Sequence, residues 1–95
     1  MENTALNLKE NNKQIYIATF FSHFGALRFK KDCEMENLKV EIMPVPRDLS
    51  SSCGTCVKFE KENLTKKDIK HSDEIEQIVQ ITKEGYKSIY KAENS

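Results

Sequence analysis

The sequence predicts a small α+β fold, in which helices cover one face of an antiparallel sheet. Four short segments are rich in β-branched and aromatic residues, or alternate polar with apolar residues, as strands do. Two longer segments carry apolar residues at helical spacing. A chain of 95 residues has the length of one domain and one modest core, so we expect any functional site on a surface loop.

The first half of the chain is predicted to form a strand, a helix and a second strand. Residues 14–21, QIYIATFF, are typical of a buried strand, and Ser22 is a good N-cap for the helix that follows. That helix covers HFGALRFKKDCEMEN, with Asn37 expected at its C′ position. Residues 38–45, LKVEIMPV, form the second strand, which ends at prolines because proline cannot donate a hydrogen bond to a neighbouring strand.

The second half is predicted to add a strand, a helix and a last strand. Residues 55–60, TCVKFE, alternate as a strand does. A second helix is expected to start at Thr65 or Ser72 and to run to about Glu84, with Gly85 as its stop signal. Its buried stripe would consist of Ile75, Ile78, Val79 and Thr82. The segment YKSIYKAE then alternates as a last strand.

The predicted order of elements is β-α-β-β-α-β. One antiparallel sheet with two helices on one face satisfies this order, which is the ferredoxin-like two-layer sandwich. The alternative is a thioredoxin-like α/β unit, which would need a helix directly after Cys56, where the sequence is strand-like. We expect residues 1–13 to be a flexible leader because they are polar and lack a period, residues 14–91 to be the single domain, and 92–95 to be a tail.

Charge and composition argue against a nucleic-acid or membrane partner. Fifteen basic and fifteen acidic side chains cancel, which removes the general electrostatic attraction to nucleic acid. The N-terminal MENTALNLKENNKQ lacks the apolar core of a secretory signal, and the apolar stretches are too short to span a bilayer. We therefore expect a cytoplasmic protein whose three cysteines are reduced and do not form a disulfide framework.

The candidate site is the segment PVPRDLSSSCGTC, residues 44–56. Cys53 is surrounded by small residues whose amides and hydroxyls could stabilise a thiolate. If the loop folds back, the guanidinium of Arg47 would lower the pKa of Cys53. The residues around the thiol are Ser51, Ser52 and Gly54. These residue types leave four interpretations open: a redox pair with Cys56, half of a metal site, a carrier of a sulfur atom, or two thiols that are close by chance.

A metal site and hydrolase machinery are not indicated. Structural zinc needs four ligands, and only Cys53 and Cys56 have ligand spacing. The remaining candidates have structural interpretations: His23 at the start of a helix, His71 on the surface and Cys33 as an inert core thiol. The position of His23 near the end of the first strand also leaves a site role open. The chain has no glycine-rich phosphate loop and no Ser/His/Asp elbow motif. We therefore expect neither a metal ion nor an organic cofactor.

Two motifs resemble those of a known family. The first is F-x-S/T-x-x-x-A-L after the first strand, and the second is P-V-P-R-x-L-S-S-S-C-G after the second strand. The matching residues are Phe21, Ser22, His23, Ala26, Leu27, Pro44, Val45, Pro46, Arg47, Leu49, Ser50, Ser51, Ser52, Cys53 and Gly54. On these residues the chain resembles the selenium/sulfur carrier protein-like family over roughly residues 14–91. It departs from the family at Cys56, where an apolar residue is expected, and in a longer segment 61–72.

The resemblance implies a carrier protein rather than a stand-alone enzyme. Cys53 would hold a persulfide or selenopersulfide, receive it from a donor protein and pass it to an acceptor protein. Arg47 would stabilise the thiolate, and Cys56 would be a possible resolving thiol. The alternatives are a thiol–disulfide redox or redox-sensing module that uses Cys53 and Cys56, and a non-catalytic interaction domain. A homodimer formed through a sheet edge is also compatible with the sequence.

Overall fold

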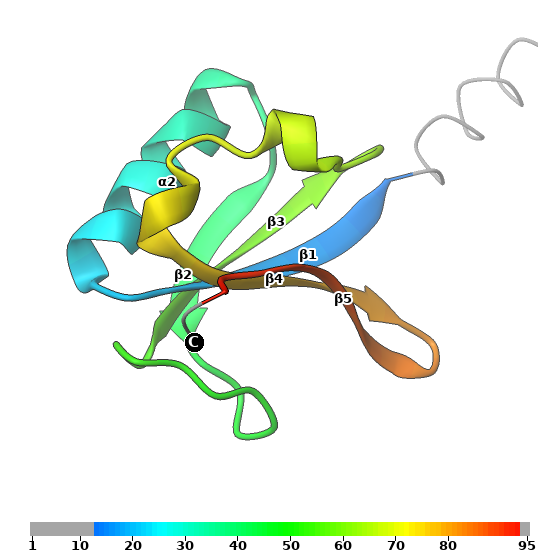
Figure 1. Ribbon diagram of the computed structural model, residues 1–95. Coiled ribbons are helices and arrows are strands. Elements are labelled where there is room, and N and C mark those ends of the chain that lie inside the picture. The colour runs from blue at the N-terminus through cyan, green and yellow to red at the C-terminus, as the bar shows by residue number, and fades with distance from the viewer. Residues whose placement is uncertain (1–12, 94–95) are drawn as a thin grey trace, which may run out of the picture.

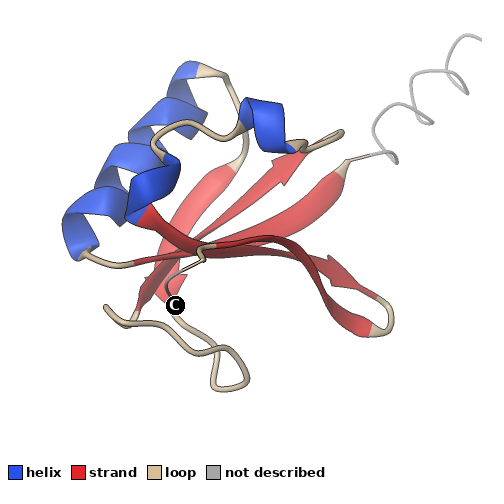
Figure 2. Ribbon diagram, viewed as in Figure 1, coloured by secondary structure: helices blue, strands red, loops and turns tan. Residues whose placement is uncertain are grey.

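The computed structural model describes residues 13–93, and within them it contains a five-stranded sheet, one α-helix and two short 3₁₀ helices (Figures 1 and 2). Residues 1–12 of the predicted leader and 94–95 of the predicted tail lie outside the described residues. The elements in chain order are β1 (Gln14–Phe20), α2 (His23–Met35), β2 (Val40–Pro44), β3 (Thr55–Lys61), η1 (Lys66–Asp68), η2 (Ser72–Glu74), β4 (Ile75–Thr82) and β5 (Gly85–Lys91).

The sheet has the strand order β2-β3-β1-β4-β5, and every neighbouring pair is antiparallel. Figure 1 shows α2 and the segment between β3 and β4 over one face of the sheet, which we call the helix face. The long loop between β2 and β3 extends along the opposite face, which we call the loop face. The chain therefore covers its sheet with a helix on one side and with residues 45–54 on the other.

Local signals place α2 where the sequence predicts it. The Ser22 hydroxyl caps the helix by accepting a hydrogen bond from the Gly25 amide at 3.2 Å. Asn37 has a φ of 61°, which confirms the predicted left-handed residue after the helix. The helix buries Ala26 and Cys33, and Phe29 packs edge-on against the sheet at 5.1 Å between ring centroids from Phe59. A single helix thus closes the main core.

The predicted second helix is wrong, because Ile75–Thr82 is strand β4. A bulge in the β1–β4 pairing inserts one extra residue, Glu76, so that Ile75 and Ile78 reach the same core although they are three positions apart. Val79 faces the other side, where a second apolar cluster lies. A bulged strand with two apolar faces thus imitates helical spacing. Gly85, predicted to stop the helix, is instead the first residue of β5, directly after the turn of the β4–β5 hairpin, and has a φ of 119°.

The observed fold is therefore α+β with an antiparallel sheet, but it has one helix instead of two. The ferredoxin-like β-α-β-β-α-β description is matched only in part. The sheet also has five strands, because the segment predicted as a helix adds one strand to the four that the sequence predicts. The main consequence for function is that both faces of the central strand β1 are buried, the loop face by the residues that precede Cys53.

The two faces carry separate apolar clusters. The helix-face cluster consists of Tyr16, Ala18, Phe20, Ala26, Cys33, Val57, Phe59, Ile75 and Ile78. The smaller loop-face cluster consists of Ile17, Cys56 and Val79, with Met43, Val45 and Leu49 packed against it. Because Val45 and Leu49 belong to the β2–β3 loop, apolar burial holds the first half of that loop against the sheet.

Candidate functional site

Two backbone hydrogen bonds shape the β2–β3 loop, and one of them joins its two ends. The amide of Val45 donates to the carbonyl of Gly54 at 3.1 Å, which brings the first and last residues of the loop together. A second bond runs from the Leu49 amide to the Pro46 carbonyl at 3.0 Å and forms a turn with Arg47 at its tip. The loop is therefore a structured excursion, with Cys53 directly before its closing residue.

Strand β4 holds the serine run of this loop. The amide and the hydroxyl of Ser52 donate to the two carboxylate oxygens of Glu76, at 3.0 and 2.8 Å. The side-chain amide of Gln77 donates to the carbonyl of Ser50 at 3.0 Å. The hydroxyl of Thr19, a fully buried residue, also donates to Glu76 at 3.3 Å. These contacts fix the segment immediately before Cys53 against the sheet.

Cys53 lies at one end of the sheet, where β1 ends and β3 begins, and is partly buried. Its thiol donates to the carbonyl of Thr55 at 3.3 Å, and its side chain packs against the helix-face cluster. In the β1–β3 register Thr19 lies opposite Cys56, so the residues after β1 and those before β3 meet at the same end of the sheet. The start of α2 is at this end of the sheet too, as Figure 1 shows. The thiol is thus presented at the rim of the molecule.

The other two thiols are buried. Cys56 is 0% exposed within β3, and burial, with a smaller contribution from Cys53, raises the pKa of its thiol from 9.0 to about 11. Its sulfur lies 3.7 Å from the carbonyl oxygen of Pro44. Cys33 is 4% exposed on the buried side of α2, and burial together with nearby acidic residues raises the pKa of its thiol from 9.0 to about 12. The core position predicted for Cys33 is confirmed, and neither buried thiol readily forms a thiolate.

A family model described as "Putative Se/S carrier protein-like" matches residues 15–91, which include α2, the cysteine loop and all of the sheet except Gln14. The chain belongs to this family. No curated protein and no solved structure is significantly similar to the chain. The family recognised from the two sequence motifs is therefore confirmed.

In this Se/S carrier-like chain, the structure brings some of the predicted site residues together. Ser52 and Gly54 flank Cys53 and are both held by hydrogen bonds. The hydroxyl of Ser51 is buried and has no hydrogen-bond partner among residues 13–93. Arg47 is exposed at the tip of its turn and makes no hydrogen bond or ion pair with any residue that the structure describes. No observed contact therefore joins its guanidinium to the thiol.

Sequence reasoning missed Glu76, Gln77 and Thr19. All three lie outside the cysteine motif, and the segment EIEQIVQIT has the apolar spacing of a helix, on which Glu76 would be one more solvated acid. Its contact with Ser52 depends on the bulge in β4. One signal was available: Glu76 lies between the apolar residues Ile75 and Ile78, and an acidic side chain is rarely buried without a partner.

No metal or membrane feature accompanies the loop. Across residues 13–93, no group of three or more His, Cys, Asp or Glu side chains is placed to hold a metal ion. The helices of that region include none long and apolar enough to cross a membrane. His23 and His71 are both exposed.

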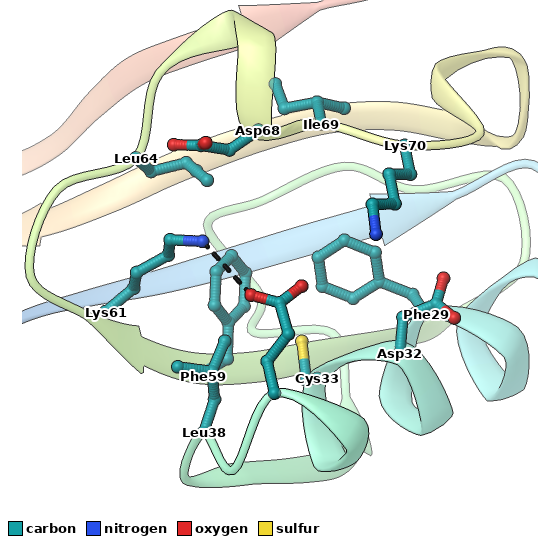
Figure 3. Close-up of a pocket in the computed structure, with 11 residues that line it drawn as sticks. Phe29, Asp32, Cys33, Leu38, Phe59, Lys61, Leu64, Asp68, Ile69 and Lys70 are labelled. Atoms are coloured by element: carbon teal, nitrogen blue, oxygen red, sulfur yellow. Dashed lines mark hydrogen bonds and ion pairs between the residues drawn. The ribbon is translucent and has the colours of Figure 1, made fainter.

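A small pocket lies under the C-terminal half of α2, at the opposite end of β3 from Cys53 (Figure 3). The thiol of Cys33 and the rings of Phe29 and Phe59 line it, and an ion pair between Lys61 and Glu36 at 3.3 Å spans its side. Its volume is about 30 Å³, comparable to the space of a single water molecule. The pocket is therefore a packing feature of the core and has no room for a substrate.

Proposed function

We propose that this protein carries a sulfur or selenium atom on Cys53 between a donor protein and an acceptor protein. The observation that carries the proposal is the contrast among the three thiols. Cys33 and Cys56 are buried, whereas Cys53 lies partly exposed at one end of the sheet, on a loop that hydrogen bonds to Glu76 hold in place. A carrier thiol must reach the active sites of two other proteins, and a rim position permits this. The family description supports the same chemistry.

The transfer is a thiol exchange with no net oxidation. The Cys53 thiolate attacks the outer sulfur of a donor persulfide, a sulfur–sulfur bond forms on Cys53, and the donor leaves as its own thiolate. The terminal sulfur keeps its proton, so Cys53 becomes a persulfide. An acceptor thiolate then attacks that terminal sulfur, and Cys53 leaves as a thiolate. Selenium in the terminal position follows the same steps.

The small size of the chain favours a carrier over a stand-alone enzyme, because one modest core leaves little room for a substrate cavity. The chain supplies one presented thiol, and the donor and acceptor supply the remaining groups. In this proposal Ser51, Ser52 and Gly54 shape the loop around the sulfur. Arg47, at the exposed turn, contributes positive charge to the surface beside the loop rather than a contact with the thiol.

Cys56 is a poor resolving thiol in the observed conformation. With a pKa of about 11, only about one molecule in ten thousand has this thiolate at pH 7. If Cys56 does attack the Cys53 persulfide, a disulfide forms, hydrosulfide leaves, and a dithiol reductant must restore both thiols. That path also requires β3 to open locally, because Cys56 is paired within the sheet. The carrier function therefore needs Cys53 alone.

The test is a loading experiment read by intact mass. The reduced protein is incubated with a cysteine desulfurase and cysteine, and the mass increase of one sulfur atom is measured for wild type, Cys53→Ser, Cys56→Ser and Cys33→Ser. Loading should be lost only in Cys53→Ser. The proposal fails if wild type takes up no sulfur, or if Cys53→Ser takes up as much as wild type.

The same variants separate the carrier from a dithiol redox module. A carrier loads on Cys53 when Cys56 is replaced by serine. A redox module instead loses its reversible oxidation in Cys56→Ser, measured as the reducible mass difference after mild oxidation. Loss of loading in both Cys53→Ser and Cys56→Ser would favour the redox interpretation.

A further inference from the structure

We infer that Glu76 is a positioning residue for the β2–β3 loop: its carboxylate holds Ser52 and so fixes the place of the Cys53 thiol at the end of the sheet. The importance of that place for transfer rests on the proposed function. The mechanical part of the inference, that Glu76 restrains the loop, stands on contacts alone.

The geometry of β4 directs Glu76 to the loop. Thr19 of β1 pairs with Gln77, and the next residue, Phe20, pairs with Ile75, so Glu76 is the extra residue of a bulge. Bulges re-aim side chains and are common beside functional sites. Here the bulge accompanies a Glu76 carboxylate that meets both the Thr19 hydroxyl and the Ser52 amide and hydroxyl.

Hydrogen bonds compensate the negative charge of the Glu76 carboxylate. The carboxylate accepts three hydrogen bonds, from Thr19 and from the amide and hydroxyl of Ser52. Among residues 13–93 it forms no ion pair with a basic side chain. Glu74, two residues earlier, is instead paired with Arg28 at 3.3 Å on the helix side. The Glu76 carboxylate therefore joins the loop to the sheet through hydrogen bonds, whereas Glu74 forms an ordinary surface ion pair.

The restraint reaches Cys53 through the backbone. Ser52 is bonded directly to Cys53, and Gly54 on the other side is held by the amide of Val45 at 3.1 Å. The thiol thus sits between two fixed residues. Loss of the Glu76 carboxylate releases the upstream side only, because the Gly54 bond and the apolar contacts of the first half of the loop remain.

The test compares Glu76→Gln with Glu74→Gln as a matched control. Glutamine keeps the size of the side chain, but it is uncharged and replaces one carboxylate oxygen with an NH₂ group that cannot accept a hydrogen bond, so it weakens the contact that now serves three donors. Two readouts are taken: the rate of alkylation of each cysteine by iodoacetamide across a pH series, and the rate of sulfur loading from a cysteine desulfurase. Rates are compared on the upper plateau of the pH profile, so that they report access to the thiol.

We expect the plateau alkylation rate of Cys53 in Glu76→Gln to rise about fivefold, and its loading rate to fall about fivefold, as befits lost hydrogen bonds at a partly exposed site. Cys33 and Cys56 report on general opening of the fold and should keep their wild-type rates. Glu74→Gln should change neither readout. A rise at Cys53 alone, with slower loading, supports the positioning role.

Several outcomes overturn it. Unchanged Cys53 alkylation shows that Glu76 does not restrain the loop, and faster alkylation of all three thiols shows a general loss of stability instead. Faster Cys53 alkylation with unchanged loading shows that the restraint has no role in transfer. If wild type takes up no sulfur, the carrier function fails, while the alkylation rates still decide whether Glu76 holds the loop.

A second variant covers the case in which Glu76→Gln does not fold. Ser52→Ala removes the hydroxyl donor to Glu76 and keeps the amide donor, so it should by itself raise the plateau alkylation rate of Cys53 above that of wild type, and an unchanged rate would contradict the inference. Where Glu76→Gln folds, the effect of Ser52→Ala should be the smaller of the two. The double variant should show less than the sum of the two single effects, because the hydroxyl and the carboxylate belong to one contact. Fully additive effects would contradict a shared contact.

Discussion

Gly54 closes the cysteine loop in a backbone conformation that other residues adopt at a cost. Its φ is +74°, and a Cβ atom built on it would meet no atom within 4 Å. The cost of Gly54→Ala is therefore conformational and not steric. A left-handed conformation costs an L-residue about 1–2 kcal/mol, so we expect the free energy of unfolding to fall by about 1 kcal/mol or slightly more.

Two companion variants make this prediction specific. Asparagine tolerates the left-handed region, so Gly54→Asn should cost less than Gly54→Ala. Gly85 has a φ of +119°, farther from the left-handed minimum, and a Cβ atom added there would also meet no atom within 4 Å. Gly85→Ala should therefore cost more than Gly54→Ala, because alanine has no comfortable conformation there.

The measurement is urea unfolding followed by circular dichroism. With a slope of about 1 kcal/mol per M for a small protein, Gly54→Ala should lower the midpoint by roughly 1 M. Amide exchange at Val45 should also accelerate, because its acceptor is the Gly54 carbonyl. A Gly54→Ala variant as stable as wild type, in a series where Gly85→Ala is destabilised, would refute the argument that loop closure requires a positive φ at this residue.

Three further predictions concern thiols and the core. At pH 8 iodoacetamide should label Cys53 at least about a hundredfold faster than Cys56 or Cys33, since the buried thiols combine raised pKa values with poor access, and peptide mapping should show this order. Between pH 9 and about 12 the unfolded state loses the Cys33 proton and the folded state keeps it, so the free energy of unfolding should fall as pH rises. Urea unfolding at several pH values should show a shallower fall for Cys33→Ala than for wild type. Tyr16, 2% exposed, accepts a hydrogen bond from the Leu64 amide at 3.2 Å, so Tyr16→Phe should cost about 1 kcal/mol in urea unfolding and accelerate exchange of that amide; an unchanged midpoint would contradict it.

The elements that the sequence predicted correctly depend on near neighbours. Ser22 caps α2 through the amide of Gly25, three residues away, and Asn37 ends the helix through its own backbone angle. The strands β1 and β3 have dense β-branched and aromatic character, and β2 ends in prolines. Each of these signals acts over a few residues, so the sequence contains all the information needed to read it.

The segment that became β4 shows where such reading fails. Its apolar residues lie three and four apart because a bulge and a second buried face alter the normal alternation of a strand. Both features exist only when β1 and the cysteine loop are in place beside it. A helix and a bulged, two-faced strand therefore share one apolar pattern, and pairing with β1 decides between them.

The sequence by itself determined the family and singled out Cys53 as the candidate working thiol, because the run from Pro44 to Gly54 is continuous and chemically unusual. Only the tertiary structure decided which thiols are buried and which residue holds the loop. Cys53 and Cys56 are three positions apart in sequence, yet one lies at the rim and the other inside the sheet. Glu76 reaches Ser52 across 24 residues of chain. Burial and long-range hydrogen bonds depend on packing between distant segments, and no local pattern records them.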